Sequence, residues 1–453
     1  MTPQLPSGAS ARRTPSILAQ TLLSFSGQSS GYVASVITGI VVARALGPAG
    51  KGVATYATIF LAVLATFTQG IQQGVLYQCG HRQQDPGRVY GAGMQLSGAV
   101  IVPAVAILAV FALLHPANVE LAYVACTLPF TVLNQLATGF FLLNNDIRAT
   151  VIQGVINTVG VALVTIPAIV IFHAGVPAVL FISSLMIVCS GIYSFFRLSS
   201  YVPLLSLRST RATLKELAWY SFRSGCSSLA GFLNLRIDVF IVKAMLDART
   251  LGIYTLAIAT GELMWQISRP LVWTTLARIA SSDEKRAVDL TAIVSRNVLA
   301  VQILIGAFVF AVAPFAVRFV YGPAYSESAD VVRWLMPGLI LYAAHGSFGY
   351  FVAIKRNRPA ATLAIQTVSI VACAIITVLT IHRLNIYGAA LATSLTYGFM
   401  FVANAALFYR FTHESPLRFV LLQREDFARV HRLISGGLAK LRLCKTPPAR
   451  VEP

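Results

Sequence analysis

Charged residues are scarce in this sequence. They make up 11% of the 453 residues, whereas 56% are hydrophobic and the mean hydropathy is +0.72. An average soluble domain has about 25% charged residues, so this composition does not supply a water-facing surface. Acidic residues are scarcest, with 16 Asp and Glu against 35 Lys and Arg. The composition therefore indicates a polytopic membrane protein.

Motifs for metal binding and catalysis are also missing. The six cysteines form no CxxC pair and the seven histidines no HExxH motif, which excludes a disulfide framework and a thiolate zinc site. No cluster of acid, base or metal ligands gathers near one interface, so we expect no enzyme and no cofactor. The Gly50-Lys51 pair lacks the GxxxxGK[ST] spacing of a phosphate-binding loop, and its glycines instead predict a tight turn.

Long apolar runs are the main feature that is present. Twelve of them reach the roughly 20 residues that a membrane-spanning helix needs. The runs lie at 22–44, 53–76, 90–114, 119–143, 150–172, 175–196, 218–246, 252–276, 291–320, 328–354, 359–382 and 385–409. The fold class is therefore an all-α integral membrane protein with about twelve transmembrane helices.

The longest loop divides these runs into two blocks of six. The predicted parts are an N-terminal segment 1–21, a first six-helix bundle 22–196, a basic linker 197–217, a second six-helix bundle 218–409 and a basic tail 410–453. With the N-terminus in the cytoplasm, 24 Lys and Arg fall on the cytoplasmic side and six on the other. The positive-inside rule then predicts that both termini are cytoplasmic. The net charge of +19 thus reflects topology, and no nucleic-acid-binding motif accompanies it.

The tail has an amphipathic pattern. Phe427, Val430, Ile434, Leu438 and Leu441 recur at steps of three and four residues, and basic residues lie between them. This pattern predicts a helix on the inner leaflet, attracted to anionic lipids. A disordered basic tail is the alternative.

The two blocks resemble one another. Val41–Ala57 aligns with Ile241–Ala257 at an offset of 200, with five identical residues that include Gly52/Gly252. Pro177–Leu185 aligns in the same order with Gly388–Thr396. Two six-helix repeats joined by a basic loop are typical of a transporter with its site between the halves.

Three stretches resemble a known family. They are ARALGPAGKGVATYA, LNLRIDVFIVKAMLDARTLGIYTLA and VYGPAYSESADVVRWLMPG, about an eighth of the chain. They are similar to helix junctions of the polysaccharide transporter family, which belongs to the multidrug/oligosaccharidyl-lipid/polysaccharide exporter superfamily. The resemblance implies movement of a lipid-linked oligosaccharide across the bacterial inner membrane. More distant members export drugs.

Polar side chains within the second block form two stripes. A charge inside a membrane is costly and usually faces a cavity or another charge. Helical spacing puts each stripe on one face of its run. The stripe of run 252–276 is Thr255, Glu262, Gln266, Arg269 and Trp273. The stripe of run 218–246 is Tyr220, Arg223, Ser224, Ser227, Gly231, Asn234 and Asp238, and Arg236 points to the opposite, apolar face.

Polar stripes in the first block are uncharged. They are Ser24, Gln28, Gly31, Ser35 and Thr38; Thr55, Thr58, Thr66, Gln69 and Gln73; and Thr127, Thr131, Asn134 and Thr138. Such residues line a lumen or serve ordinary helix packing, and both readings stay open, although the glutamines favour lining. Some lipid flippases of the superfamily have arginines that face the cavity on the first helix. In this sequence Ser35, Thr38 and their neighbours on that helix are neutral.

These stripes define the candidate site. Guanidinium groups match phosphate oxygens, so Arg223 and Arg269 are the predicted diphosphate clamp. The other predicted lumen residues are Gln266, Gln69, Gln73 and Asn234. Asp238 or Glu262 could titrate and couple transport to protons or sodium; a structural pairing of arginines and acids across the two helices is the alternative.

The favoured function is a flippase for an undecaprenyl-diphosphate-linked oligosaccharide that serves an O-antigen, capsule or exopolysaccharide pathway. The expected partners are this lipid-linked oligosaccharide, anionic inner-leaflet lipids and, as candidates, a polysaccharide polymerase and chain-length proteins. A cation-coupled multidrug exporter on the same fold is the alternative.

Overall fold

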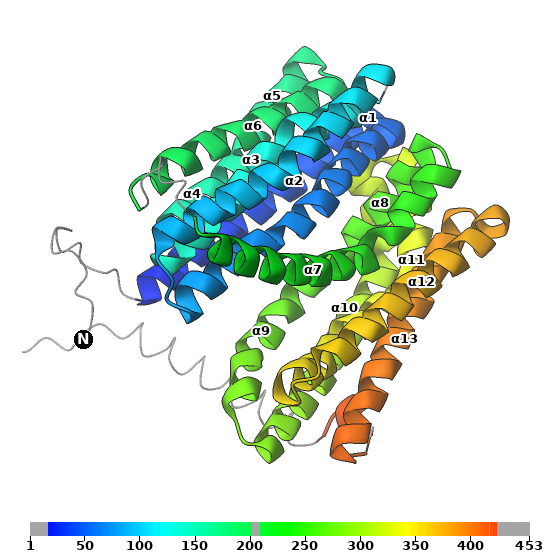
Figure 1. The fold of residues 1–453 in the computed structure, drawn as a ribbon. Coiled ribbons are helices and arrows are strands. Elements are labelled where there is room, and N and C mark those ends of the chain that lie inside the picture. Colours follow the sequence, from blue (N-terminus) through cyan, green and yellow to red (C-terminus); the bar gives the residue numbers. More distant parts are fainter. Residues whose placement is uncertain (1–16, 117, 202–208, 416, 424–453) are drawn as a thin grey trace, which may run out of the picture. The chain divides into compact units, whose positions relative to one another are not determined.

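The computed structural model describes residues 17–116, 118–201, 209–415 and 417–423, and within these ranges it is built from helices without strands (Figure 1). Ten of its helical segments are long and apolar enough to cross a membrane. The prediction of an all-α membrane protein is confirmed.

The first six predicted runs correspond to helices at closely similar positions. These are α1 (Ile17–Val75) with the π-helical turn η1 (Leu76–His81), α2 (Pro86–Leu114), α3 (Val119–Leu143), α4 (Ile147–Val155) continued by the π-helical η2 (Ile156–Gly160) and α5 (Val161–Phe172), and α6 (Val176–Leu198). The fifth run is therefore one continuous span that contains a π-helical segment.

Helix α1 contains the first two runs. Its two arms meet at Gly47, which has φ 65° and ψ −178°. This positive φ is available to glycine at little cost. Pro48 follows, and proline suits the first residue of a new helix. Side chains of both arms line the same cavity, so the arms form a hairpin.

The later runs correspond to a second set of helices. These are α7 (Arg211–Met245), α8 (Ala248–Glu262), α9 (Trp265–Ser281), α10 (Glu284–Tyr321), the short η3 (Pro323–Tyr325), α11 (Ser326–Tyr350) with the π-helical η4 (Phe351–Lys355), α12 (Pro359–Leu384), α13 (Ile386–Thr412) and the short α14 (Leu417–Val420). With α1 counted as two spans and α8–α9 as one, the described part of the chain contains the expected twelve.

The eighth run, 252–276, is not the single helix that the sequence suggested. A turn at Leu263 and Met264 separates α8 from α9. Gln302 of α10 donates from Nε2 to the Met264 carbonyl oxygen at 3.1 Å and to Ser268 Oγ at 2.8 Å. The Met264 carbonyl oxygen also accepts from the Ile267 amide at 3.4 Å, so Gln302 adds a contact that fastens the turn to α10.

The chain forms two compact units. Unit 1 comprises Met1–Arg236, Leu246–Gly252 and Val320–Ala324, and unit 2 comprises Ile237–Met245, Ile253–Phe319 and Tyr325–Pro453. The division at 197–217 that the charge pattern suggested stays a prediction, as does the cytoplasmic position of the termini. The predicted amphipathic tail helix lies outside the described residues.

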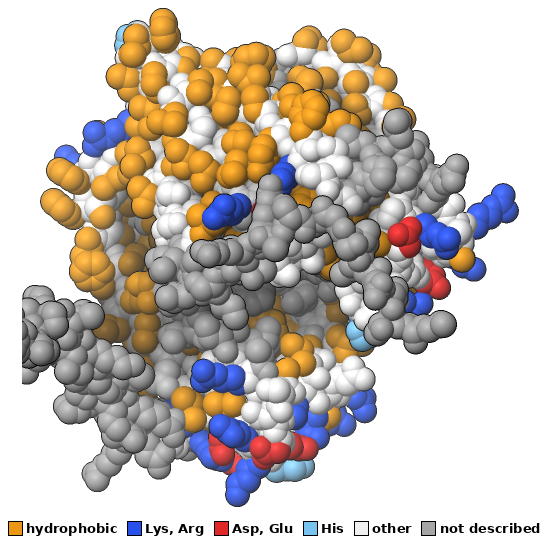
Figure 2. Space-filling view, turned by 90° about the vertical axis from the view of Figure 1, so that its left-hand side faces the viewer, with side chains coloured by type: hydrophobic (Ala, Val, Ile, Leu, Met, Phe, Trp, Pro, Cys, Tyr) orange, Lys and Arg blue, Asp and Glu red, His pale blue; other side chains and the backbone are white. Residues whose placement is uncertain are grey.

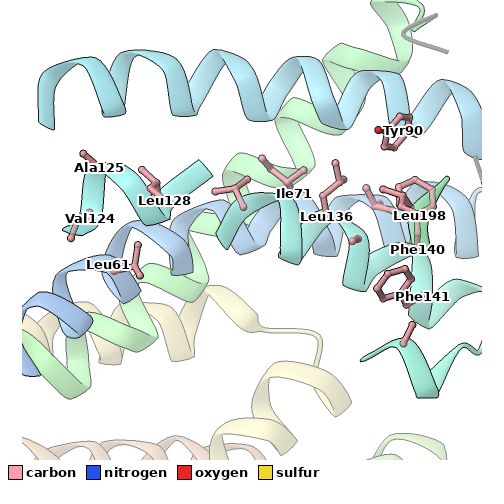
Figure 3. Packing of buried hydrophobic residues seen from close by; sticks show 14 of the residues in the cluster. Leu61, Ile71, Tyr90, Val124, Ala125, Leu128, Leu136, Phe140, Phe141 and Leu198 are labelled. Atoms are coloured by element: carbon pink, nitrogen blue, oxygen red, sulfur yellow. The ribbon is translucent and has the colours of Figure 1, made fainter. Parts of the chain in front are cut away.

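Helix α3 is central to the core of unit 1. It packs against α1, α2 and α6. Figure 3 shows its side chains Leu128, Leu136 and Phe140 directed toward those of neighbouring helices, and all three are buried. Burying each such side chain contributes roughly 1.5–3 kcal/mol in water, but in a membrane close packing is the main source of the gain.

The core of unit 2 surrounds α13, which packs against α11 and α12. A cluster of aromatic rings joins Phe348, Phe351, Phe408 and Phe419, with ring centroids 4.7–5.9 Å apart for the contacting pairs. Phe419 belongs to the short α14, and Arg418 beside it forms an ion pair with Glu414 at 2.8 Å. The chain that follows α13 is thereby fixed to the end of this bundle.

The outer faces of both units are apolar. Leu113, Phe172 and Leu304 are 82%, 78% and 74% exposed. On the face drawn in Figure 2, hydrophobic side chains cover broad stretches while charged ones gather in a few groups. Patches of this extent are unusual on a soluble monomer, and they match a lipid-facing surface.

The predicted internal repeat has a structural counterpart in unit 1. A Cβ at Gly52 would collide with the carbonyl oxygen of Ala248, and a Cβ at Gly252 would collide with that of Pro48. The offset of 200 relates both members of each contact, 48 to 248 and 52 to 252. Equivalent residues of the two repeats thus meet reciprocally, and only glycine permits this approach.

Candidate functional site

Three neighbouring cavities lie within unit 1. Their volumes are about 640, 360 and 530 Å³, within the range of roughly 300–1,000 Å³ that is usual for ligand pockets. We call them the outer, upper and central cavities in that order. The outer and upper cavities share Ser35 and Thr158, the outer and central share Thr150 and Gly154, and the upper and central share Thr58 and Asn157.

The uncharged stripes of the first block supply much of these walls. Gln28, Gly31 and Ser35 line the outer cavity. Thr38, Thr55 and Thr58 line the upper cavity, and Thr131, Asn134 and Thr138 line the central one. Thr127 instead is buried and donates to the Tyr123 carbonyl oxygen at 2.6 Å. Of the two readings that the sequence left open, cavity lining holds for most members and packing for Thr127.

A hydrogen-bond network holds the central cavity's wall in place. Asn134 Oδ1 accepts from Gln153 Nε2 at 2.9 Å and from Ser194 Oγ at 2.8 Å. Thr138 Oγ1 donates to Gln153 Oε1 at 2.8 Å. These contacts join α3, α4 and α6, so the polar groups on the wall are positioned before any ligand arrives.

Hydroxyl groups on the walls mostly donate to their own helices. Thr38 donates to the Ala34 carbonyl oxygen, Thr58 to Thr55, Thr158 to Gly154 and Ser183 to Val179, at 2.7–2.9 Å. A hydroxyl has one proton and two lone pairs, so these side chains present acceptors to the cavity. A wall rich in acceptors suits a ligand with many hydroxyl donors.

One lysine is the sole charged residue among those that line the three cavities. Lys51 lies one turn into the second arm of α1 and lines the upper cavity. Lys51 was expected to belong to a tight turn and was not among the predicted site residues. A signal was present, because Lys51, Thr55 and Thr58 are spaced by four and three residues and therefore share a helical face.

Three of the predicted site residues lie near the contact of α1 with α7 in unit 1. Gln73 donates from Nε2 to Ser228 Oγ at 3.3 Å and accepts from Ser224 Oγ. Gln69 is exposed. Arg223 is exposed and lies over the ring of Trp219, 5.9 Å from its centroid. The structure thus brings Gln73 together with Ser224, a member of a different predicted stripe, and Arg223 with an aromatic side chain.

Asp238 is held in a buried hydrogen-bond cluster of unit 2. It is 2% exposed. Its Oδ2 accepts from Tyr254 Oη at 2.5 Å and from Thr393 Oγ1 at 2.8 Å, and its Oδ1 accepts from the Val239 amide at 2.8 Å. The cluster links α7, α8 and α13. Asn234, one turn earlier in α7, is also buried, and Arg236 donates to the Leu235 carbonyl oxygen at 3.0 Å.

The predicted stripe of the eighth run is divided by the α8–α9 turn. Glu262 ends α8, whereas Gln266 and Arg269 belong to α9. The turn lies between Glu262 and Gln266, so the single face expected over the whole run stays a prediction. Arg269 is exposed and lies over Trp265, 5.8 Å from the ring centroid. Trp265 itself is buried and donates to the Leu339 carbonyl oxygen at 3.0 Å.

A charged cluster at the end of α6, with Asp146 and Tyr201 outside the membrane-spanning segments, stabilises one end of unit 1. Arg197 donates to Asp146 Oδ2 from Nε at 2.8 Å and from Nη2 at 2.6 Å, and Tyr201 Oη donates to the same oxygen. Burial acts to raise the pKa of Asp146, but the hydrogen bonds from Tyr201, Arg197 and the Ala149 amide outweigh it. The pKa of Asp146 is therefore lowered.

A family model described as polysaccharide biosynthesis protein matches residues 41–330. The chain belongs to this family. The match includes all of the upper cavity's lining except Ser35, Thr38 and Gly39. No match among curated protein sequences reaches significance.

Several solved structures have a fold similar to that of this chain. The lipid II flippase MurJ in an inward closed conformation is 12% identical with a TM-score of 0.71, covering 95% of this chain and 93% of that one. An inward-facing multidrug resistance MATE family transporter of the MOP superfamily is 14% identical with a TM-score of 0.68, covering 89% and 98%. The eukaryotic MATE transporter AtDTX14 is 14% identical with a TM-score of 0.63, covering 91% and 99%. At these identities the likeness shows the fold alone.

Proposed function

We propose that the protein is a flippase that moves an undecaprenyl-diphosphate-linked oligosaccharide across the bacterial inner membrane for cell-surface polysaccharide biosynthesis. Membership of the polysaccharide biosynthesis family supports the pathway, and the likeness to the lipid II flippase supports the mode of action. The reaction moves a head group and makes no covalent bond, so the proposal requires neither an enzyme centre nor a cofactor.

The observation that carries the proposal is the chemistry of the cavity walls in unit 1. Hydroxyl and amide side chains line them, no carboxylate is among the lining residues, and Lys51 is the sole charge. A sugar head group offers many hydroxyl donors to such walls. A polar head in these cavities with its lipid tail in the bilayer fits the alternating-access scheme of transporters with internal repeats.

The predicted site residues have roles within this proposal. Arg223 and Arg269 bind the diphosphate, since a guanidinium is always charged and matches phosphate oxygens. Gln69, Gln73, Asn234 and Gln266 supply further polar contacts. Glu262 is the better coupling candidate, because the Asp238 carboxylate is already satisfied by three hydrogen bonds. A polysaccharide polymerase and chain-length proteins are the partners that the pathway requires.

The second candidate is a cation-coupled multidrug exporter, which the likeness to MATE transporters favours. An exporter of organic cations needs acidic groups in its binding cavity. The walls of the three described cavities have a lysine and no acid, which would repel such a substrate. We therefore rank this function second.

The test is made on a deletion strain of the source bacterium. Undecaprenyl-diphosphate-linked glycans are extracted and quantified with the gene absent, restored, and restored as Arg269→Ala. Accumulation that reverses with the restored gene supports the flippase. An unchanged glycan pool, together with new sensitivity to cationic dyes, would replace it by the exporter.

A further inference from the structure

Lys51 occupies an unusual position for a basic side chain. It lies in the wall of the upper cavity, where its neighbours are Ser35, Thr38, Thr55, Thr58 and Asn157 among others. Within the described ranges its ammonium group has neither a hydrogen bond nor an ion pair. An ammonium group has three donors to satisfy, and leaving a charge without a partner away from water is costly.

Two acceptors on residues that line the three cavities are also without a hydrogen bond. Asn157 donates from Nδ2 to Ser190 Oγ at 3.1 Å, but its Oδ1 is buried without a hydrogen bond. Thr150 Oγ1, on the wall shared by the outer and central cavities, is likewise buried without one. Both residues lie on the α4–η2 segment, and the π-helical turn η2 places Asn157 and Thr158 on the upper cavity's wall.

The cavity also has room beside the lysine. Gly39, on the first arm of α1, lines the upper cavity, and a Cβ built there would meet no atom within 4 Å. Gly154 on the wall between the outer and central cavities has the same open surroundings. The lysine without a partner therefore lies in the wall of a cavity that has room for a ligand.

We propose that Lys51 is the anion-binding residue of a saccharide site within unit 1. Its ammonium pairs with a negatively charged group on the ligand, either a phosphate oxygen or the carboxylate of an acidic sugar. The lone pairs of the wall hydroxyls accept from sugar hydroxyls. This inference rests on the proposed function, which supplies the saccharide nature of the ligand. The new element is that the ligand is negatively charged.

A cation site is the competing interpretation of a cavity rich in oxygen acceptors. The ammonium of Lys51 already supplies a positive charge there, so a sodium ion or an organic cation would meet repulsion. A purely structural lysine would have an acidic or carbonyl partner within hydrogen-bond distance. The arrangement therefore fits an anionic ligand best.

The test is equilibrium binding to the purified full-length protein in detergent. The probes are a disaccharide containing glucuronic acid, its neutral glucose counterpart, and inorganic pyrophosphate. The variants are Lys51→Met, which keeps the side chain's bulk without the charge, Lys51→Arg, which restores the charge, and Gly39→Phe, which fills the cavity. Gly98→Phe is the matched control, because Gly98 on α2 has equally open surroundings and lines none of the three cavities.

We expect wild type to bind at least one anionic probe, and Lys51→Met to weaken that binding about tenfold or more, as loss of a charged hydrogen bond predicts. Lys51→Arg should stay close to wild type, Gly39→Phe should lose binding, and Gly98→Phe should keep it. Binding of pyrophosphate would identify the lipid diphosphate as the source of the charge, and binding of the acidic disaccharide would identify the glycan.

Anion binding by Lys51→Met equal to that of wild type, or no binding of either anion by wild type, would overturn the inference. The proposed function is judged separately, by the lipid-linked glycan pool of the deletion strain. A glycan pool that rises on deletion but is restored fully by Lys51→Met would reject this site while the flippase stands.

Discussion

The two units use buried polar groups in opposite ways. In unit 1, hydroxyls and amides surround cavities, and Lys51 and Asn157 keep unused hydrogen-bonding capacity. In unit 2, the carboxylate of Asp238 is enclosed and satisfied by Tyr254, Thr393 and a backbone amide. The uncharged stripes thus line cavities, as the proposed function requires, whereas the buried carboxylate joins three helices. A charge within a span does not by itself mark the lumen.

The largest effect is expected from Asp238→Ala. The change leaves the hydroxyls of Tyr254 and Thr393 without their acceptor, and two unsatisfied buried donors cost about 2–5 kcal/mol. Thermal unfolding in detergent should show a clearly lower midpoint and membrane abundance should fall. Thr38→Val in the upper cavity, as the matched change in unit 1, should have little effect on either.

Asp238→Ala also tests whether the two units differ in their use of buried polar groups. A variant of normal stability and abundance that fails to transport would show that Asp238 acts in coupling. The two units would then both use buried polar groups for function.

The contact between the repeats should show the next largest effect. Gly52→Val places a side chain against the Ala248 carbonyl oxygen, and overpacking of this kind costs about 1–3 kcal/mol. Gly39→Val adds the same side chain to open space in the same helix. Size-exclusion profiles of the two purified variants should show loss of folded protein for Gly52→Val alone, and equal yields would contradict the assigned packing.

Arg269→Ala tests the proposed role of this residue in binding the diphosphate. Removal of a charged contact to a diphosphate costs about 1.5–3 kcal/mol, so transport should fall tenfold or more. Immunoblots of membrane fractions should show unchanged abundance, because Arg269 is exposed. Normal transport by this variant would reject its role in the clamp.

The smallest effect concerns pH. The pKa of Asp146 is lowered in the folded protein, so its contribution to stability is present above the unfolded-state value of about 3.9 and is lost as the pH falls through the lowered pKa. The melting temperature should therefore drop modestly at acidic pH. Tyr201→Phe removes one of the hydrogen bonds to Asp146 and should reduce that drop; an unchanged pH profile would contradict the assigned cause.

Much of the fold follows from the sequence because span length, loop charge and repeat spacing are local properties. The hairpin at Gly47 and the reciprocal contact of Gly52 with Gly252 both lie where the sequence suggested a turn and a repeat. The α8–α9 break was not foreseen, and the turn is held by contacts from Gln302 of another helix. Helical spacing alone carries no information about such a partner.

Only part of the candidate site was predicted, and the reason is similar. The periodic hydroxyls of the first block were recognised as candidates, yet Lys51 was assigned to the turn although Thr55 and Thr58 continue its helical face. Asp238 was expected to face a lumen, but Tyr254 and Thr393 enclose it. Spacing shows which residues share a face, whereas the surroundings of that face depend on tertiary packing.

The most direct test of the account is translocation in vesicles that contain only this protein and an undecaprenyl-diphosphate-linked oligosaccharide. The glycan exposed on the outer leaflet is measured over time by its reaction with an impermeant sugar oxidant. We predict that glycan from the inner leaflet becomes reactive with wild type, more slowly with Lys51→Met, and not in protein-free vesicles. Equal reactivity with and without the protein would contradict the flippase assignment.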